Sequence, residues 1–141
     1  MRTSVLKKTL SMVADPSRCT FERSLGSIDL LGNLSPEERL AAACDGTIDI
    51  AAALFGVSGR ELRHPGRSTV DVSRVRQVAM YVAHVALGLS MRDVGQGFGR
   101  DRTTVLHACH LIEDLRDDAE FDGMVATMER IVTVAFGRRE A

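Results

Sequence analysis

The chain has 141 residues, of which 45% are hydrophobic and 26% are charged, and its formal net charge is −1. This composition suits one globular domain with a small appendage, and the near-neutral total excludes attraction to nucleic acid or membranes by overall charge alone. The longest uncharged run, residues 77–91, is shorter than the roughly 20 residues that a membrane-spanning helix needs. Three widely spaced cysteines without a Cys-x-x-Cys pair favour neither a disulfide framework nor a zinc site. We therefore expect a cytoplasmic protein without a membrane partner.

Residues 1–34 have weak hydrophobic periodicity and several helix breakers, among them Pro16, Gly26 and Gly32. Such a segment is typical of a flexible or partner-dependent arm. We therefore place the helical domain at residues 35–141 and treat the arm 1–34 as the candidate element for a homodimer.

Capping signals predict two helices at the start of this domain. Ser35 is followed by a proline and two glutamates, which is typical of a helix N-terminus, and we expect this helix to end near Ala43. Thr47 can cap a second helix that continues to Phe55.

The middle of the chain combines a short helix, a basic loop and a long amphipathic helix. A capping box at Ser58 opens the short helix, and His64-Pro65-Gly66 ends it. Residues 63–74 are rich in arginine and read as a basic loop. Valine and alanine then recur at helical spacing, which predicts an amphipathic helix over Ser73–Leu87.

The last third predicts three more helices. Ser90 caps a helix that ends near Phe98, and Gly99 separates it from a helix over 101–116. Residues 118–121 are either a break or a new start, and Met124–Val134 reads as the final helix. With no convincing strand anywhere, the fold class is all-α.

The two helices around Gly99 have the pattern of a helix-turn-helix, at about residues 90–116. Gly95 is small enough for the helices to touch, Gly99 lies in the turn, and Val105 is a β-branched anchor for the second helix.

Basic charge gathers around this motif. Residues 60–110 contain eight arginines and four acidic residues, so their net charge is +4 and that of the rest of the chain is −5. All four histidines also lie in this segment. A local basic zone on a near-neutral chain indicates a nucleic-acid site. The arginines that we expect to neutralise phosphates are Arg67, Arg74, Arg76, Arg92 and Arg100.

The first turn of the helix 101–116 is unusual in composition. Asp101 lies near its N-cap, but Arg100 and Arg102 place positive charge at the positive end of the helix dipole, where an anion is favoured instead. A DNA phosphate or base edge offsets that cost, because helix N-termini bind phosphate and arginine reads guanine. We therefore interpret this turn as the DNA-reading end of the motif.

The segment from Arg76 to Cys109, RQVAMYVAHVALGLSMRDVGQGFGRDRTTVLHAC, resembles the C-terminal DNA-binding domain of the bacterial replication initiator DnaA. That family carries an Arg-Gln-x-Ala-Met-Tyr-Leu helix, a Ser-Leu-x-x-Ile-Gly helix and then Phe-Gly-Gly-Arg-Asp-His-Thr-Thr-Val-Leu-His-Ala. The likeness covers about residues 47–117 and implies a Trp-repressor-like fold that places a helix-turn-helix in the major groove and a basic loop near the minor groove. No GxxxxGK[ST] motif is present, so we expect a free-standing small relative without the initiator's ATPase domain.

The resemblance also implies a role for each matching position. The positions that match base-reading residues are Asp101, Arg102 and Thr103. The positions that look like contacts to the DNA backbone are Thr104, His107, Arg76 and Gln77. Arg67 and Ser68 fall where the family's basic loop sends an arginine into the minor groove. Arg102 replaces the family's histidine and one glycine is missing before Arg100, and both departures concern which DNA sequence is read.

These observations favour a sequence-specific regulator that binds double-stranded DNA at promoters or replication origins, associated with the nucleoid. The alternative is a protein-interaction adaptor that keeps the fold, for which the acidic stretch 113–122 and the arm 1–34 could serve. An enzyme is the weakest interpretation, because no catalytic set is recognisable, and we expect no cofactor. His107 and His110 share a helix face, but zinc needs three or four convergent ligands.

Overall fold

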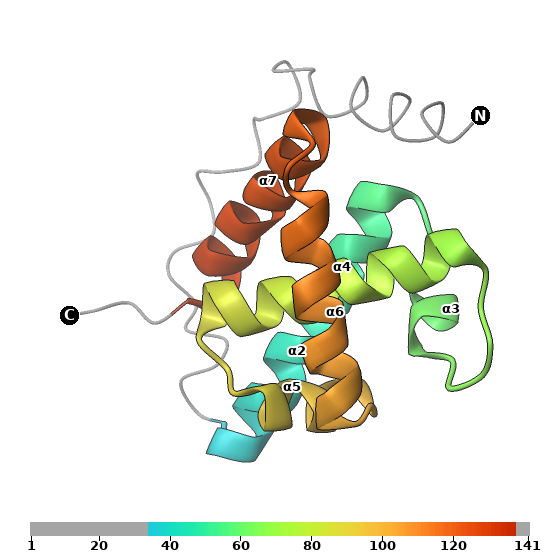
Figure 1. Ribbon diagram of the computed structural model, residues 1–141. Coiled ribbons are helices and arrows are strands. Elements are labelled where there is room, and N and C mark those ends of the chain that lie inside the picture. The colour runs from blue at the N-terminus through green and yellow to red at the C-terminus, as the bar shows by residue number, and fades with distance from the viewer. Residues whose placement is uncertain (1–33, 138–141) are drawn as a thin grey trace. The chain divides into compact units, whose positions relative to one another are not determined.

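The computed structural model describes residues 34–137, and this range contains six helices and no strand (Figure 1). In chain order they are α2 (Pro36–Phe55), α3 (Gly59–Arg63), α4 (Val70–Leu87), α5 (Met91–Phe98), α6 (Arg102–Leu115) and α7 (Ala119–Phe136). The all-α prediction is therefore confirmed. The chain divides into two units, residues 1–39 and 40–141. The predicted arm 1–34 and its dimer contact lie outside the described residues, apart from Leu34.

Helix α2 begins as the sequence predicts. The Ser35 N–H donates to Glu38 Oε2 at 2.8 Å, and the Glu38 N–H donates to Ser35 Oγ at 3.2 Å. These reciprocal bonds form a capping box, and the backbone bond to Ser35, followed by the side-chain bond, lowers the pKa of the Glu38 carboxyl.

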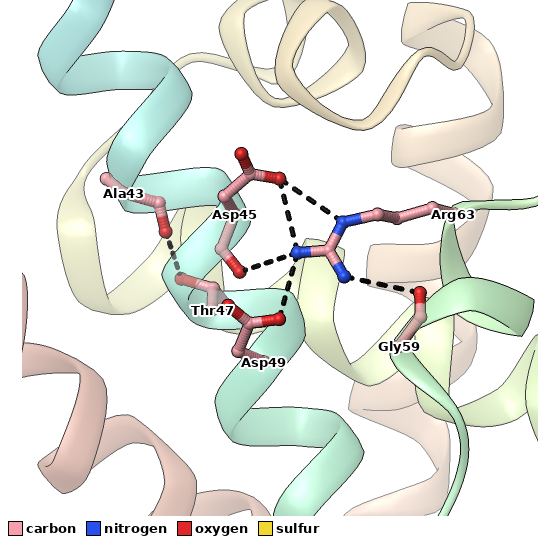
Figure 2. Close-up of polar contacts among 6 residues, drawn as sticks. All are labelled: Ala43, Asp45, Thr47, Asp49, Gly59 and Arg63. Atoms are coloured by element: carbon pink, nitrogen blue, oxygen red, sulfur yellow. Dashed lines mark hydrogen bonds and ion pairs between the residues drawn. The ribbon is translucent and has the colours of Figure 1, made fainter.

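The predicted break between Ala43 and Thr47 is wrong, because α2 continues without interruption to Phe55. Thr47 does not cap a new helix. Its side chain is fully buried, and its hydroxyl donates to the Ala43 carbonyl oxygen at 2.7 Å within the same helix (Figure 2). A threonine hydroxyl that bonds to the carbonyl one turn earlier is satisfied in a helix interior, and the buried Ile48 and Ala51 hold this turn in the core.

Helix α4 starts three residues earlier than predicted. Thr69 Oγ1 accepts from the Val72 N–H at 3.3 Å, so the cap lies at Thr69 and the first helical residue is Val70. The basic loop is correspondingly shorter than 63–74, because only residues 64–69 separate α3 from α4.

Helix α4 is the central element of the unit 40–141. It packs against α3, α5, α6 and α7, and α6 crosses it in Figure 1. Its buried face includes Val78, Ala79 and Val82, which are at most 1% exposed. Most of the core therefore forms around this one helix.

The end of α6 is joined to α7 and α4 by Arg116. Its Nε donates to Asp122 Oδ1 at 2.6 Å, and its Nη1 donates to Glu129 Oε1 and to the Tyr81 hydroxyl. The bond to Asp122, with smaller contributions from Tyr81 and Glu129, raises the pKa of this guanidinium. Helix α7 starts at Ala119, five residues before the predicted Met124, because the Asp118 side chain accepts from the Phe121 N–H.

Candidate nucleic-acid interface

Helices α5 and α6 form the predicted helix-turn-helix. The Ser90 hydroxyl caps α5 by accepting from the Asp93 N–H at 3.1 Å. Gly99 ends α5 in the left-handed conformation, with φ of 64°, and the Arg100 N–H donates back to the Gly95 carbonyl at 2.8 Å. Glycine adopts this conformation without the steric cost that other residues incur. The turn between the helices is therefore short and held by its own backbone.

Gly95 and Val105 have the positions that the motif requires. A Cβ atom at Gly95 would lie only 2.6 Å from the Arg100 carbonyl oxygen, so the turn that leads into α6 passes directly over this residue. Val105 is completely buried and anchors α6. Both predictions are confirmed, and together they fix how α6 is presented.

The N-terminal half of α6 faces solvent. Its exposed residues are Arg102, Thr103, Thr104, Leu106 and His107, and the preceding Asp101 is exposed as well. Asp101 occupies the N-cap position, but its side chain makes no capping hydrogen bond. The Asp101 side chain therefore does not satisfy the free N–H groups of the first turn, and its carboxylate is available to a ligand.

The loop 64–69 carries Arg67 on the surface beside the start of α4. Arg67 is exposed, whereas Ser68 is half-buried and shares a hydrogen bond of 3.0 Å with Ser73. Ser68 Oγ also accepts from Arg76 Nη1 at 3.1 Å. Of the two loop positions singled out from the sequence, only Arg67 is free to reach outward.

Arg76 lies in the interior of the unit. It is 8% exposed, and its Nε donates to the Leu62 carbonyl at 2.8 Å while Nη2 donates to the Glu61 carbonyl at 2.9 Å. Burial, and secondly the charge of Arg100, lower the pKa of Arg76. We expected Arg76 to contact a DNA phosphate. Its geometry instead favours a structural role, in which it holds the end of α3 and the start of the loop.

Arg100 also contacts the loop. Its Nη2 donates to the His64 carbonyl at 2.8 Å and its Nη1 donates to the Pro65 carbonyl at 3.2 Å, although these residues are more than thirty positions away. The sequence gives no sign of this contact, because backbone carbonyls of a distant loop carry no residue-specific pattern.

The other three predicted contact residues lie on α4 and α5. Arg92 is exposed on α5, and Gln77 is half-buried on α4. Arg74 is half-buried, and its Nη1 atom is buried without a hydrogen-bond partner in the structure. Arg92 is thus directly available to a ligand, whereas Arg74 and Gln77 are only partly so.

The match to a known family agrees with this geometry. Residues 45–112 match the model of the family described as the bacterial DnaA protein helix-turn-helix. This part of the chain is a DnaA-type helix-turn-helix domain. The matched range begins inside α2 and ends in α6, so it includes the loop 64–69 and both helices of the motif.

Three relatives named chromosomal replication initiator protein DnaA show the same likeness. The protein of Lachnoclostridium phytofermentans is 32% identical over 94 residues, which are 65% of this chain and 20% of the relative. The protein of Mycobacteroides abscessus is 36% identical over 96 residues, 67% of this chain and 19% of the relative. That of Thermomicrobium roseum is 42% identical over 89 residues, 62% of this chain and 17% of the relative. The chain thus spans about a fifth of the length of these relatives.

Arg63, at the end of α3, forms its ion pairs within the DnaA-type domain. Its guanidinium lies between two carboxylates of α2, with Nη2 at 2.9 Å from Asp49 Oδ1 and 3.3 Å from Asp45 Oδ1 (Figure 2). The bond to Asp49 raises the pKa of Arg63. Charge counting along the sequence includes Arg63 in the basic zone, but its contacts connect α3 to α2.

Two further observations concern the remaining surfaces of the domain. Residues 34–137 contain no group of three or more histidine, cysteine or acidic side chains arranged to hold a metal ion, so His107 and His110 stand without a third ligand there. In the same range, no helix combines the length and apolar character that crossing a membrane requires.

Proposed function

We propose that this DnaA-type domain binds double-stranded DNA in a sequence-specific manner and thereby regulates transcription or a replication origin. The observation that carries the proposal is the exposed first turn of α6. Asp101 without a capping bond, Arg102 and Thr103 lie together at the end of a helix whose other side is anchored by the buried Val105.

The chemistry of this turn suits base edges in the major groove. An arginine donates two hydrogen bonds to guanine, an aspartate accepts from the amino group of cytosine, and a threonine methyl contacts thymine. In a helix-turn-helix, the N-terminal residues of the second helix are the ones that reach the bases. Arg102, Asp101 and Thr103 are therefore the proposed base-reading residues.

The surrounding groups suit the phosphate backbone and the minor groove. Thr104 and His107 follow on the exposed face of α6, and Arg92 is exposed on α5. Arg67 extends from the loop 64–69, where an arginine can enter a narrow minor groove. Phosphate contacts position the protein and base contacts select the sequence.

The three relatives are named as chromosomal replication initiators, which supports a replication-origin site as one target class for this chain. Association with the nucleoid would follow from DNA binding. A homodimer formed through the arm 1–34 remains a separate proposal, to be tested by sedimentation of the full chain.

Selection of binding sites from a random duplex library, followed by titration at several salt concentrations, tests the proposal. If Arg67, Arg74 and Arg92 each neutralise a phosphate, log K against log salt concentration should have a slope of about −3 or steeper. Arg92→Gln should make the slope shallower by about one unit, whereas Arg60→Gln, the same charge change on α3 outside the proposed contacts, should leave it unchanged. A flat salt response with no enriched sequence would overturn DNA binding and restore the adaptor interpretation.

A further inference from the structure

Two arginines from distant parts of the chain converge on the loop 64–69. Arg100 comes from the turn between α5 and α6, and Arg76 comes from α4. Both donate to the same carbonyl oxygen, that of His64, at 2.8 Å from Arg100 and 3.4 Å from Arg76. The loop is therefore held from two sides by side chains.

The first part of the loop depends on these contacts because it has little structure of its own, whereas Ser68 is also held by its hydrogen bonds to Ser73 and Arg76. Pro65 and Gly66 interrupt the backbone pattern, and the one hydrogen bond within residues 64–66 is that of the Gly66 N–H to His64 Nδ1. A guanidinium donates several bonds in one plane, so Arg100 can bind the His64 and Pro65 carbonyls at the same time.

The two ends of the Arg100 contact lie next to the two proposed DNA-reading elements. Pro65 is two residues before Arg67, and Arg100 is two residues before Arg102. The backbone at Arg100 is itself fixed, because its N–H donates to the Gly95 carbonyl at 2.8 Å. A chain of short, directed contacts thus connects the loop arginine to the first turn of α6.

We propose that Arg100 is a positioning residue that sets the distance between the loop carrying Arg67 and the recognition helix α6, and so determines which spacing of minor-groove and major-groove contacts the domain accepts. This proposal rests on the DNA binding proposed above. It differs from a phosphate contact by Arg100, because the guanidinium acts through the loop and not on DNA.

The free protein gives the first test. In ¹⁵N relaxation measurements on the full chain, we expect backbone order parameters at Gly66 and Arg67 near the rigid value of about 0.85 in the wild type, and below about 0.6 in Arg100→Gln. Arg60→Gln removes the same charge from exposed α3 and should leave these values unchanged. Thermal unfolding of each variant separates release of the loop from loss of the fold. Unchanged order parameters in a folded Arg100→Gln variant would overturn the proposal.

The second test measures DNA affinity. It compares the duplex selected by the wild type with duplexes in which the base pairs contacted by the loop are moved by one base pair relative to those contacted by α6. We expect the wild type to bind the shifted duplexes about tenfold more weakly, as for a mismatched site, and both Arg100→Lys and Arg100→Gln to lose most of this discrimination. If Arg100 contacts phosphate, lysine will instead restore affinity and keep the spacing preference.

A double-mutant cycle with Arg67 completes the design. Because Arg100 is proposed to act through the loop, its replacement should matter less than about twofold once Arg67→Ala is present, whereas independent contacts would multiply. Multiplied effects would overturn the positioning role. If the wild type selects no duplex at all, the proposed function fails, and the order parameters still decide whether Arg100 holds the loop.

Discussion

A methyl group added at Gly95 tests the contact between α5 and the turn into α6. An alanine Cβ there would lie 2.6 Å from the Arg100 carbonyl oxygen and 3.5 Å from the Arg102 nitrogen. Both atoms belong to the backbone, which cannot rotate aside as a side chain can. Separating the helices should cost about 1–3 kcal/mol, as other overpacking substitutions do, while the better helix propensity of alanine returns up to about 1 kcal/mol. We therefore expect Gly95→Ala to lower the free energy of unfolding by about 1–2 kcal/mol.

Gly123→Ala is the matched control on α7. Gly123 is exposed within a helix, and an added Cβ meets no atom within 4 Å. The propensity gain then stands alone, and the variant should be more stable by about 0.5–1 kcal/mol. Thermal unfolding of the full chain should move Tm in opposite directions, by about 4–8 °C for each kcal/mol in a domain of this size. A Gly95→Ala variant as stable as Gly123→Ala would refute the close approach of α5 to the turn.

Three further predictions concern single side chains. Arg102→Ala should weaken binding to the selected site by about 1–3 kcal/mol and relax the sequence preference at one or two base pairs. Arg102→His should move the sequence preference toward the site selected by a DnaA relative assayed in parallel. An unchanged preference in both variants excludes base reading by this side chain. Arg76→Ala should destabilise the fold by about 2–3 kcal/mol in urea unfolding, because the Glu61 and Leu62 carbonyls lose a charged donor, whereas a stable variant with a shallower salt slope would identify a phosphate contact. Burial raises the pKa of the Cys44 thiol from 9.0 to about 11. Above about pH 9 the thiol ionises more readily in the unfolded chain than in the fold, so the free energy of unfolding, at its full value below that pH, should fall by about 2–3 kcal/mol as the pH rises to 11. Cys44→Ala should make the decline in urea unfolding over this pH range clearly smaller, with the part due to Cys109 left, because burial raises the pKa of that thiol too. An equal decline would show that Cys44 does not contribute to it.

Local signals in the sequence were sufficient at three helix ends, but not at Ser58, which lies at the N-cap of α3 without the predicted capping bond from its side chain. Ser35, Ser90 and Gly99 begin or end helices as predicted, because a capping hydroxyl or a left-handed glycine acts on its immediate neighbours. The spacing of Gly95 and Val105 predicted the helix-turn-helix for the same reason, since both residues act within one pair of adjacent helices.

Tertiary packing decided the cases in which a residue has two local options. Thr47 can cap a helix or lie inside one, and the buried face that it shares with Ile48 selects the interior, where the Ala43 carbonyl accepts its proton. The starts of α4 and α7 were placed too late. In both helices the first residues follow directly on the caps at Thr69 and Asp118, whose hydroxyl and carboxylate accept from the backbone three residues later.

The basic zone shows most clearly what the sequence determines and what the tertiary structure decides. The sequence alone determined that arginines gather between residues 60 and 110 and that the first turn of α6 carries groups suited to base edges. It did not determine which arginines reach a ligand. Arg63 binds two carboxylates of α2, while Arg76 and Arg100 bind backbone carbonyls from 12 to 36 residues away. Only Arg67, Arg92 and Arg102 remain fully at the surface among those assigned to DNA. Charge is a property of the residue, but the partner of a charge depends on which backbone and carboxylate oxygens the fold brings within about 3 Å of it.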